Sequence, residues 1–125
     1  MVVKVVDTSA IAALLFGEPE AETVADLLEG ASLVAPALLS FELTNVCLIK
    51  MRRHPDQQSA LTSAFRLRDR LGVRETAVNH DEMLDLATST GLTAYDASYL
   101  WLSRYLGVEL VTLDRQLAKA YAMMR

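Results

Sequence analysis

The chain has 125 residues, of which 52% are hydrophobic and 22% are charged, with a net charge of -4. This balance predicts one folded domain over residues 1–125 and excludes a disordered chain. No apolar run approaches the ~20 residues of a membrane helix, and the first residues lack the layout of a signal peptide. The acidic balance argues against a protein that coats nucleic acid through its overall field. The single cysteine, Cys47, excludes an internal disulfide and favours a cytoplasmic location.

Strand-like and helix-like segments alternate along the chain. Short β-branched runs predict strands, and longer segments bounded by glycine, proline or capping residues predict helices. Pro36 is expected in the first turn of the third helix, and Arg74 and Glu75 indicate that the third strand is a sheet edge. The alternation predicts an α/β fold around a parallel sheet of about four strands. The expected strands are residues 2–6, 32–35, 73–78 and 109–113, and the expected helices are residues 10–16, 18–29, 36–53, 55–71, 81–89, 93–106 and 114–123.

Four acidic residues each stand alone in an otherwise uncharged stretch: Asp7, Glu42, Asp96 and Asp114. A carboxylate buried without a partner costs on the order of several kcal/mol, so four of them indicate a shared cation. Carboxylate oxygens suit the hard cations Mg²⁺ and Mn²⁺. Asp7 and Asp114 directly follow the first and last expected strands. Because the carboxyl ends of parallel strands meet at one edge of a sheet, we expect these two side chains to lie close together.

Three of these acids also have a purely structural explanation. Asp7 and Asp114 are good N-caps for the helices that follow them, and Thr93 with Asp96 fits a capping box. Glu42 lies about one and a half turns inside its expected helix, where no cap explains it; its alternative is a satisfied polar position in the core. The coincidence of all four acids favours the metal site.

Basic residues gather in two short clusters, residues 50–53 and residues 66–74. They are either solvated helix surfaces or a basic rim, including Arg52 and Arg53, that holds a phosphate backbone beside the acidic pocket. Metal ions in such a pocket can activate water and stabilise the leaving oxygen of a phosphodiester. The pattern therefore indicates metal-dependent phosphodiester hydrolysis.

Four segments in order along the chain resemble motifs of one family, the PIN-domain ribonucleases, and specifically the VapC-like toxins of toxin–antitoxin pairs. They are residues 5–10 (Val-Val-Asp-Thr-Ser-Ala), 36–46, 92–99 (Leu-Thr-Ala-Tyr-Asp-Ala-Ser-Tyr) and 110–115 (Leu-Val-Thr-Leu-Asp-Arg). The resemblance spans nearly the whole chain and implies a single PIN-like, three-layer α/β/α domain. Family domains often finish with a short edge strand after the last helix, and we expect that strand to be missing or vestigial here.

The resemblance implies a Mg²⁺- or Mn²⁺-dependent endoribonuclease. Asp7 and Asp96 would be the main metal ligands, Glu42 would complete the acidic set and help to orient the attacking water, and Asp114 would be its outer member. Ser9 and Thr112 would hydrogen-bond these carboxylates. The implied partners are an RNA substrate, a small antitoxin protein that covers the active-site groove, and a second copy of the chain, which would dock through helix surfaces such as residues 18–28 and 38–49.

Three alternatives stay open. The first is a signalling receiver domain, although Asp7 lacks the acidic neighbour that such domains have after their first strand. The second is a PIN-like binding module without activity, and the third is a housekeeping RNA-processing nuclease. We expect Tyr95, Tyr99 and Trp101 to be core or interface residues rather than a platform for stacking RNA bases.

Overall fold

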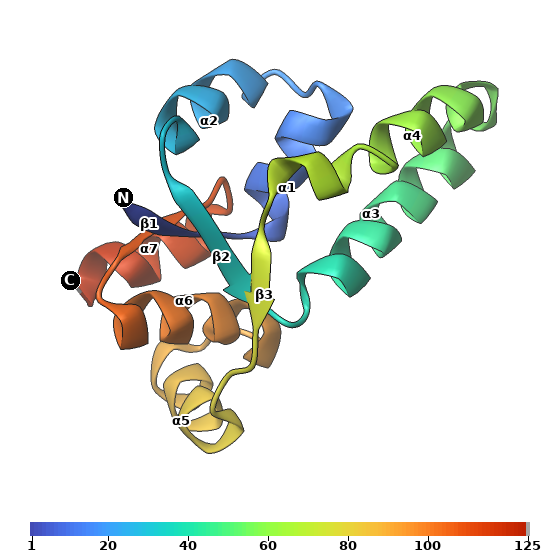
Figure 1. Ribbon diagram of the computed structural model, residues 1–125. Helices are drawn as coiled ribbons and strands as arrows, with labels where there is room; N and C mark the ends of the chain where they lie inside the picture. Colours follow the sequence, from blue (N-terminus) through green and yellow to red (C-terminus); the bar gives the residue numbers. More distant parts are fainter. Residues whose placement is uncertain (125) are drawn as a thin grey trace.

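The computed structural model describes residues 1–124, along which strands and helices alternate as expected (Figure 1). The strands are β1 (Val3–Val6), β2 (Ser32–Pro36), β3 (Arg74–Thr76) and β4 (Glu109–Val111). The α-helices are α1 (Thr8–Phe16), α2 (Ala21–Leu28), α3 (Leu39–Arg53), α4 (Gln58–Phe65), α5 (His80–Thr90), α6 (Ala94–Leu106) and α7 (Arg115–Met123), and two 3₁₀ turns are η1 (Pro55–Gln57) and η2 (Arg68–Leu71).

The four strands form one parallel sheet in the order β3-β2-β1-β4, which confirms the expected α/β class. The chain steps from β1 to β2 to β3 in one direction, so right-handed crossovers place α1 to α4 on the same face. The step from β3 to β4 runs the other way and places α5 and α6 on the opposite face. The chain therefore reverses direction at β1, and the switch point between β1 and β4 is where open α/β sheets bind their ligands.

Helices cover β1 on both faces, and its residues Val5 and Val6 are fully buried. Helix α6 packs against β1, β2 and β4, with α5 and α7 beside it. Its buried residues include Tyr99, Leu100 and Leu102. The sheet order also makes β3 an edge strand, as its charged residues predicted. Within residues 1–124, no strand follows α7, so β4 forms the other edge.

Helix α3 begins three residues later than expected. Pro36 is the last residue of β2, where it pairs with Thr76 of β3, and the backbone N–H of Ala37 donates to the Thr76 carbonyl at 2.8 Å. A proline is tolerated at a strand end because its missing N–H leaves no ladder bond unmade there. This correction moves Glu42 into the first turn of α3.

Residues 55–71 form two 3₁₀ turns around the short helix α4, not the single helix that we expected. Helix α4 ends at Phe65, where the Arg68 guanidinium donates to the Phe65 carbonyl at 3.1 Å and lies 4.1 Å from the centre of its ring. Likewise α2 starts at Ala21 instead of residue 18, and Glu18 pairs with Lys50 of α3 at 2.9 Å. Helices α3 and α4 lie side by side and project from the sheet as an arm (Figure 1).

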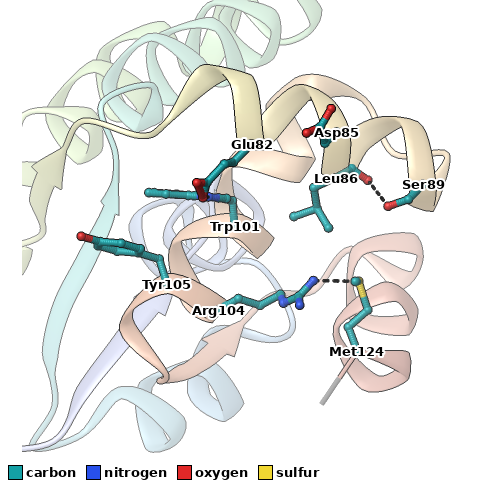
Figure 2. Close-up of a pocket in the computed structure, with 8 residues that line it drawn as sticks. All are labelled: Glu82, Asp85, Leu86, Ser89, Trp101, Arg104, Tyr105 and Met124. Carbon is teal, nitrogen blue, oxygen red and sulfur yellow. Dashed lines mark hydrogen bonds between the residues drawn. The ribbon is translucent and has the colours of Figure 1, made fainter.

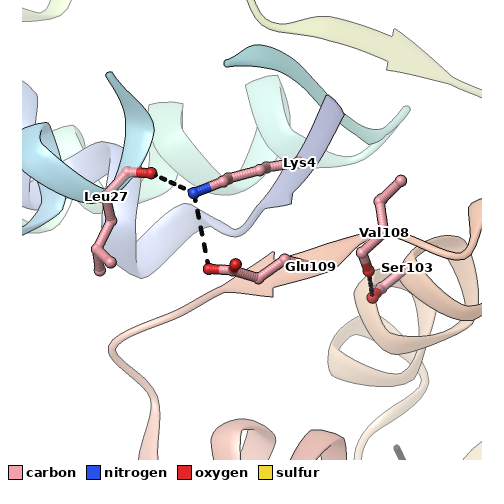
Figure 3. A network of polar contacts seen from close by, with 5 residues as sticks. All are labelled: Lys4, Leu27, Ser103, Val108 and Glu109. Carbon is pink, nitrogen blue, oxygen red and sulfur yellow. Dashed lines mark hydrogen bonds and ion pairs between the residues drawn. The ribbon is translucent and has the colours of Figure 1, made fainter. Parts of the chain in front are cut away.

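Lys4 of β1 contacts both α2 and β4 (Figure 3). Its ammonium group donates to the Leu27 carbonyl near the end of α2 at 2.6 Å and lies 3.8 Å from the Glu109 carboxylate of β4. A cation stabilises the partial negative charge of a helix C-terminus.

In the described part of the chain, no helix is long and apolar enough to cross a membrane.

We expect Lys4→Met to lower the free energy of unfolding by about 1–2 kcal/mol, because it removes a charged hydrogen bond to the Leu27 carbonyl. Glu109→Gln should cost less than about 0.5 kcal/mol, because its ion pair is long and half-exposed. Urea denaturation of the two variants measures both values. Equal losses would show that the ion pair, and not the helix terminus, is what Lys4 stabilises.

Candidate active site

Asp7 follows β1 and caps α1 with its carboxylate. Oδ1 accepts hydrogen bonds from the backbone N–H of Ala10 at 3.1 Å and from the Ser9 hydroxyl at 2.7 Å, and Oδ2 accepts from the Thr112 hydroxyl at 2.5 Å. The residue is only 4% exposed. Thr112 lies just after β4, so this carboxylate joins the ends of two adjacent strands.

The hydroxyls of Ser9 and Thr112 each have one proton, and both donate it to the Asp7 carboxylate. The same hydroxyl oxygens also accept hydrogen bonds. Ser9 Oγ accepts from the backbone N–H of Leu113 at 2.9 Å, and Thr112 Oγ1 accepts from the backbone N–H of Asp114 at 3.0 Å. Each hydroxyl therefore links the Asp7 carboxylate to the backbone that leads into α7. This arrangement fixes the position of Asp114 relative to Asp7.

Asp114 caps α7 by accepting the backbone N–H of Leu117 at 2.8 Å. Burial raises the pKa of Asp7 above its ordinary value of 3.8, and the nearby charge of Asp114 raises it further, while the bonds from Thr112, Ser9 and Ala10 lower it. The two acids that follow adjacent strands thus lie close enough to repel each other, as the sequence predicted.

Asp96 lies in the first turn of α6. Its backbone N–H donates to the hydroxyl of Thr93 at 3.1 Å, which is the N-cap half of the expected capping box. Desolvation raises the pKa of Asp96, and the charges of Asp114 and Glu42 add to this increase. A contact with the Thr93 hydroxyl lowers the pKa in turn. Within residues 1–124 no backbone N–H donates to this carboxylate, so a role as a helix cap does not explain the side chain.

Glu42 is held by two hydroxyls that sequence reasoning missed. Its Oε1 accepts from Thr8 of α1 at 2.8 Å and from Tyr99 of α6 at 2.7 Å, while the two hydroxyl oxygens lie 2.9 Å apart. Burial is the main reason that the pKa of Tyr99 is raised, and the neighbouring Glu42 adds to it. The signal for this contact was the buried tyrosine itself, because a buried phenol needs a polar partner.

The electrostatic couplings link the acids pairwise: Asp7 with Asp114, Asp96 with Asp114, and Asp96 with Glu42. Across residues 1–124, no three acidic, histidine or cysteine side chains come close enough to form a ready metal cage. The donor set still fits a hard cation, because every candidate ligand is an oxygen and Mg²⁺ is commonly held by one or two carboxylates and several waters. A cation would also relieve the repulsion that adds to the effect of burial on the pKa values of Asp7 and Asp96.

The structure does not place Arg52 and Arg53 beside these acids. Both are exposed near the end of α3, ten residues or more beyond Glu42, which is roughly 15 Å at 1.5 Å per residue. They lie at the far end of the arm that α3 and α4 form (Figure 1).

A separate hollow lies between α5, the later turns of α6 and Met124 (Figure 2). Trp101 stacks on Tyr105 there with ring centres 4.8 Å apart, and its indole N–H donates to Glu82 at 3.0 Å. Its acidic residues, Glu82 and Asp85, are not among the four predicted acids. Of the aromatic residues on α6 that we expected in the core or at an interface, Tyr99 lies in the core, whereas Tyr95 is 62% exposed and is therefore not a core residue.

Comparisons with known proteins agree on the family. A family model described as PIN domain matches residues 4–123. Ribonuclease VapC3 from Pyrobaculum aerophilum is 33% identical over 122 residues, covering 94% of this chain and 93% of the relative. The crystal structure of PAE2754 from the same organism matches with a TM-score of 0.76 and 27% identity, covering 95% of this chain and 84% of that chain. VapC20 of Mycobacterium tuberculosis, a toxin that cleaves the sarcin–ricin loop, shares the fold with a TM-score of 0.66 and 20% identity over 94% of each chain.

The two buried or half-buried acids should respond oppositely to amide substitution. We expect Asp7→Asn to lower the free energy of unfolding by about 1–3 kcal/mol, because one amide oxygen cannot accept from Ala10, Ser9 and Thr112 together. Asp96→Asn should instead raise the melting temperature by a few degrees, because it removes a partly desolvated charge and its repulsion from Asp114 and Glu42, while the amide oxygen can still accept from the Thr93 hydroxyl. Thermal denaturation at pH 7 without divalent metal measures both changes.

The stabilisation by Asp96→Asn should depend on pH. Because folding raises the pKa of Asp96, the wild-type protein loses stability as the pH rises from the ordinary pKa through the folded one. The advantage of the asparagine variant should be complete at neutral pH and should disappear below about pH 4. An advantage that stays constant from pH 4 to pH 7 would show that charge repulsion is not its cause.

Proposed function

This chain belongs to the PIN domain family, and from that membership we propose that it is a metal-dependent endoribonuclease and the toxin of a toxin–antitoxin pair. The relative Ribonuclease VapC3 supports the activity, since the similarity extends over nearly the full length of both chains. The observation that carries the proposal is the gathering of Asp7, Asp96, Asp114 and Glu42 at the switch point of the sheet. RNA phosphodiester hydrolysis at this edge is the activity that we expect.

Asp7 and Asp96 are the proposed main ligands of a divalent cation, Mg²⁺ or Mn²⁺, with Asp114 as the outer ligand. The bound cation supplies positive charge that lets a phosphodiester approach the acids and helps to ionise water. Ser9 and Thr112 hold the Asp7 carboxylate in one orientation, since each gives it a proton and is itself anchored by a backbone N–H. Glu42 has Oε1 occupied by two hydroxyls, so its other oxygen, Oε2, is the one left to orient the attacking water.

The remaining partners follow from the same family. A small antitoxin protein would cover the acids, and a second copy of the chain would dock on exposed apolar side chains such as Leu27, Leu48 and Ile49, which are 42%, 38% and 41% exposed. Arg52 and Arg53 would contact the RNA backbone at phosphates away from the scissile one, because they lie at the end of the arm. Contacts of that kind add affinity that falls as salt rises.

Purified protein, freed of any bound partner, should cut total RNA into discrete fragments when Mg²⁺ or Mn²⁺ is present. EDTA should abolish the cleavage, and Asp96→Asn should lower it by at least about a hundredfold because a ligand to the cation is lost. Asp26→Asn is the matched control, since Asp26 is an exposed acid on α2, and it should cut normally. Full activity of Asp96→Asn, or cleavage that persists in EDTA, would contradict the proposed site.

Tyr99→Phe should reduce kcat about tenfold while KM changes little, because Glu42 keeps only one of its two hydroxyl donors and loses its fixed orientation. The ring stays in the core, so the melting temperature should change little compared with the loss of activity. Tyr105→Phe, on the exposed end of α6, is the control. If kcat and KM move together with the melting temperature, Tyr99 has only a structural role.

A further inference from the structure

A cavity of about 350 Å³ opens beside the acids, on the face of the sheet that carries α5 and α6. Three segments form its walls: the connection from β2 to α3, the connection from β3 to α5, and the first turns of α6. Figure 1 shows these segments meeting at the carboxyl ends of β2 and β3. The volume lies at the lower end of the range of ~300–1,000 Å³ that is usual for ligand pockets.

Some residues that line the cavity come from the same two helix starts that carry Glu42 and Asp96. Leu38 lines it and accepts the backbone N–H of Glu42 at 3.1 Å. Tyr95 and Ser98 also line it, and they are the sequence neighbours of Asp96 and Tyr99. A phosphate held at the acids would therefore place an adjoining nucleotide at the mouth of this cavity.

The chemistry of the walls suits an uncharged planar group. Pro36, Leu38, Val78 and Met83 make most of the surface apolar, and no Lys, Arg, Asp or Glu lies among the described residues that line it. A phosphate would find no counter-charge here, whereas the face of a nucleobase would bury apolar area. Polar recognition at the rim is limited to the His80 imidazole and the Tyr95 hydroxyl, neither of which has a hydrogen-bond partner in the part of the chain that the structure describes.

Two open aromatic rings accompany the cavity. Tyr95, directly before Asp96, is 62% exposed, and Phe41, directly before Glu42, is 78% exposed. Phe41 lies in the first turn of α3, three residues after Leu38, which lines the cavity. Large exposed aromatic side chains are costly to leave in water, and stacking on an unpaired RNA base is a use that fits their place beside the acids.

We propose that this cavity receives the unstacked nucleobase next to the scissile phosphate, with Tyr95 as its stacking surface and Phe41 supporting the following base. The proposal rests on the proposed function and adds to it the place where the base beside the scissile phosphate binds. The His80 imidazole, which also lines the cavity, would hydrogen-bond the edge of the base and give a preference among the four bases. An apolar side chain of a protein partner would also fit the walls, but the two rings beside the two acids favour a base.

The first test uses the dinucleotides ApA, UpU, CpC and GpG with an uncharged methylphosphonate linkage, in EDTA, so that the acids do not repel the ligand and binding is measured without cleavage. NMR titration should give saturable shifts for the methyl groups of Leu38 and Met83 with at least one dinucleotide. Tyr95→Ala should weaken that binding by about fivefold or more, the fold-change expected when one base–aromatic stack is lost, and Tyr95→Phe should restore it. Tyr105→Ala is the matched control, because Tyr105 is 71% exposed at the other end of α6.

The second test determines which nucleotide beside the scissile phosphate contacts Tyr95. An oligonucleotide with one mapped cleavage site is compared with versions in which a single nucleotide beside the scissile phosphate is abasic. One abasic position should raise KM for the wild-type protein and for Tyr105→Ala by about fivefold or more, but should have no further effect on Tyr95→Ala. That non-additivity is the signature of direct contact between the base and the ring.

The outcomes separate this proposal from the proposed function. The base pocket would be overturned if no dinucleotide shifted the Leu38 or Met83 signals, or if the effects of the abasic nucleotide and of Tyr95→Ala were fully additive. Either result would favour a protein partner as the occupant of the cavity, even if RNA is cleaved. Saturable binding that Tyr95→Ala weakens would support the pocket even if RNA cleavage failed; the nuclease assignment alone would then fall.

Discussion

The buried carboxylate of Asp7 is the constraint on which the rest of the site depends. It stands in the middle of the sheet edge with almost no contact with water, so every donor around it must be supplied by the protein. Those donors come from the start of α1 and from the segment after β4, and the same hydroxyls then orient the backbone before Asp114. The Asp7 carboxylate thereby fixes the starts of α1 and α7 and the spacing between the ends of β1 and β4. It also fixes the position of the second carboxylate, that of Asp114. Burial raises its pKa, which shows that the donors offset only part of the cost.

The sheet topology explains why acids from distant segments meet. Strand β1 is central, and the chain leaves it toward β2 on one side while β4 arrives on the other. The crevice at this switch point opens at the carboxyl ends of the strands, and α3 and α6 both begin beside it. Glu42 and Asp96 lie in the first turns of those helices, and Tyr99 reaches across from α6 to hold Glu42. The site is therefore built from segment ends, whose positions the sheet sets, and not from one continuous motif.

Local chemistry made most of the fold predictable. Strands and helices alternate as expected, and Asp7, Thr93 and Asp114 cap the helices that the sequence assigned to them. The start of α3 was wrong, because a proline suits both a helix start and a strand end, and only the pairing with β3 decides between them. The contact of Tyr99 with Glu42 spans 57 residues of sequence, and the exposure of Tyr95 depends on how α6 sits against its neighbours. Neither is written in any local pattern, so periodicity and spacing could not reveal them.

The link between Asp7 and Thr112 also has a meaning for the making of the protein. Domains begin to fold from the amino terminus during synthesis, and β1, α1 and the first two acids emerge early. Thr112 and Asp114 are made after the other residues of the candidate site, and until β4 joins β1 the Asp7 carboxylate lacks the hydroxyl that orients it. A growing chain thus carries an incomplete site until β4 has been made and has joined the sheet, and during that time it lies on the ribosome, which is itself rich in RNA. Chain order alone therefore delays completion of the candidate site.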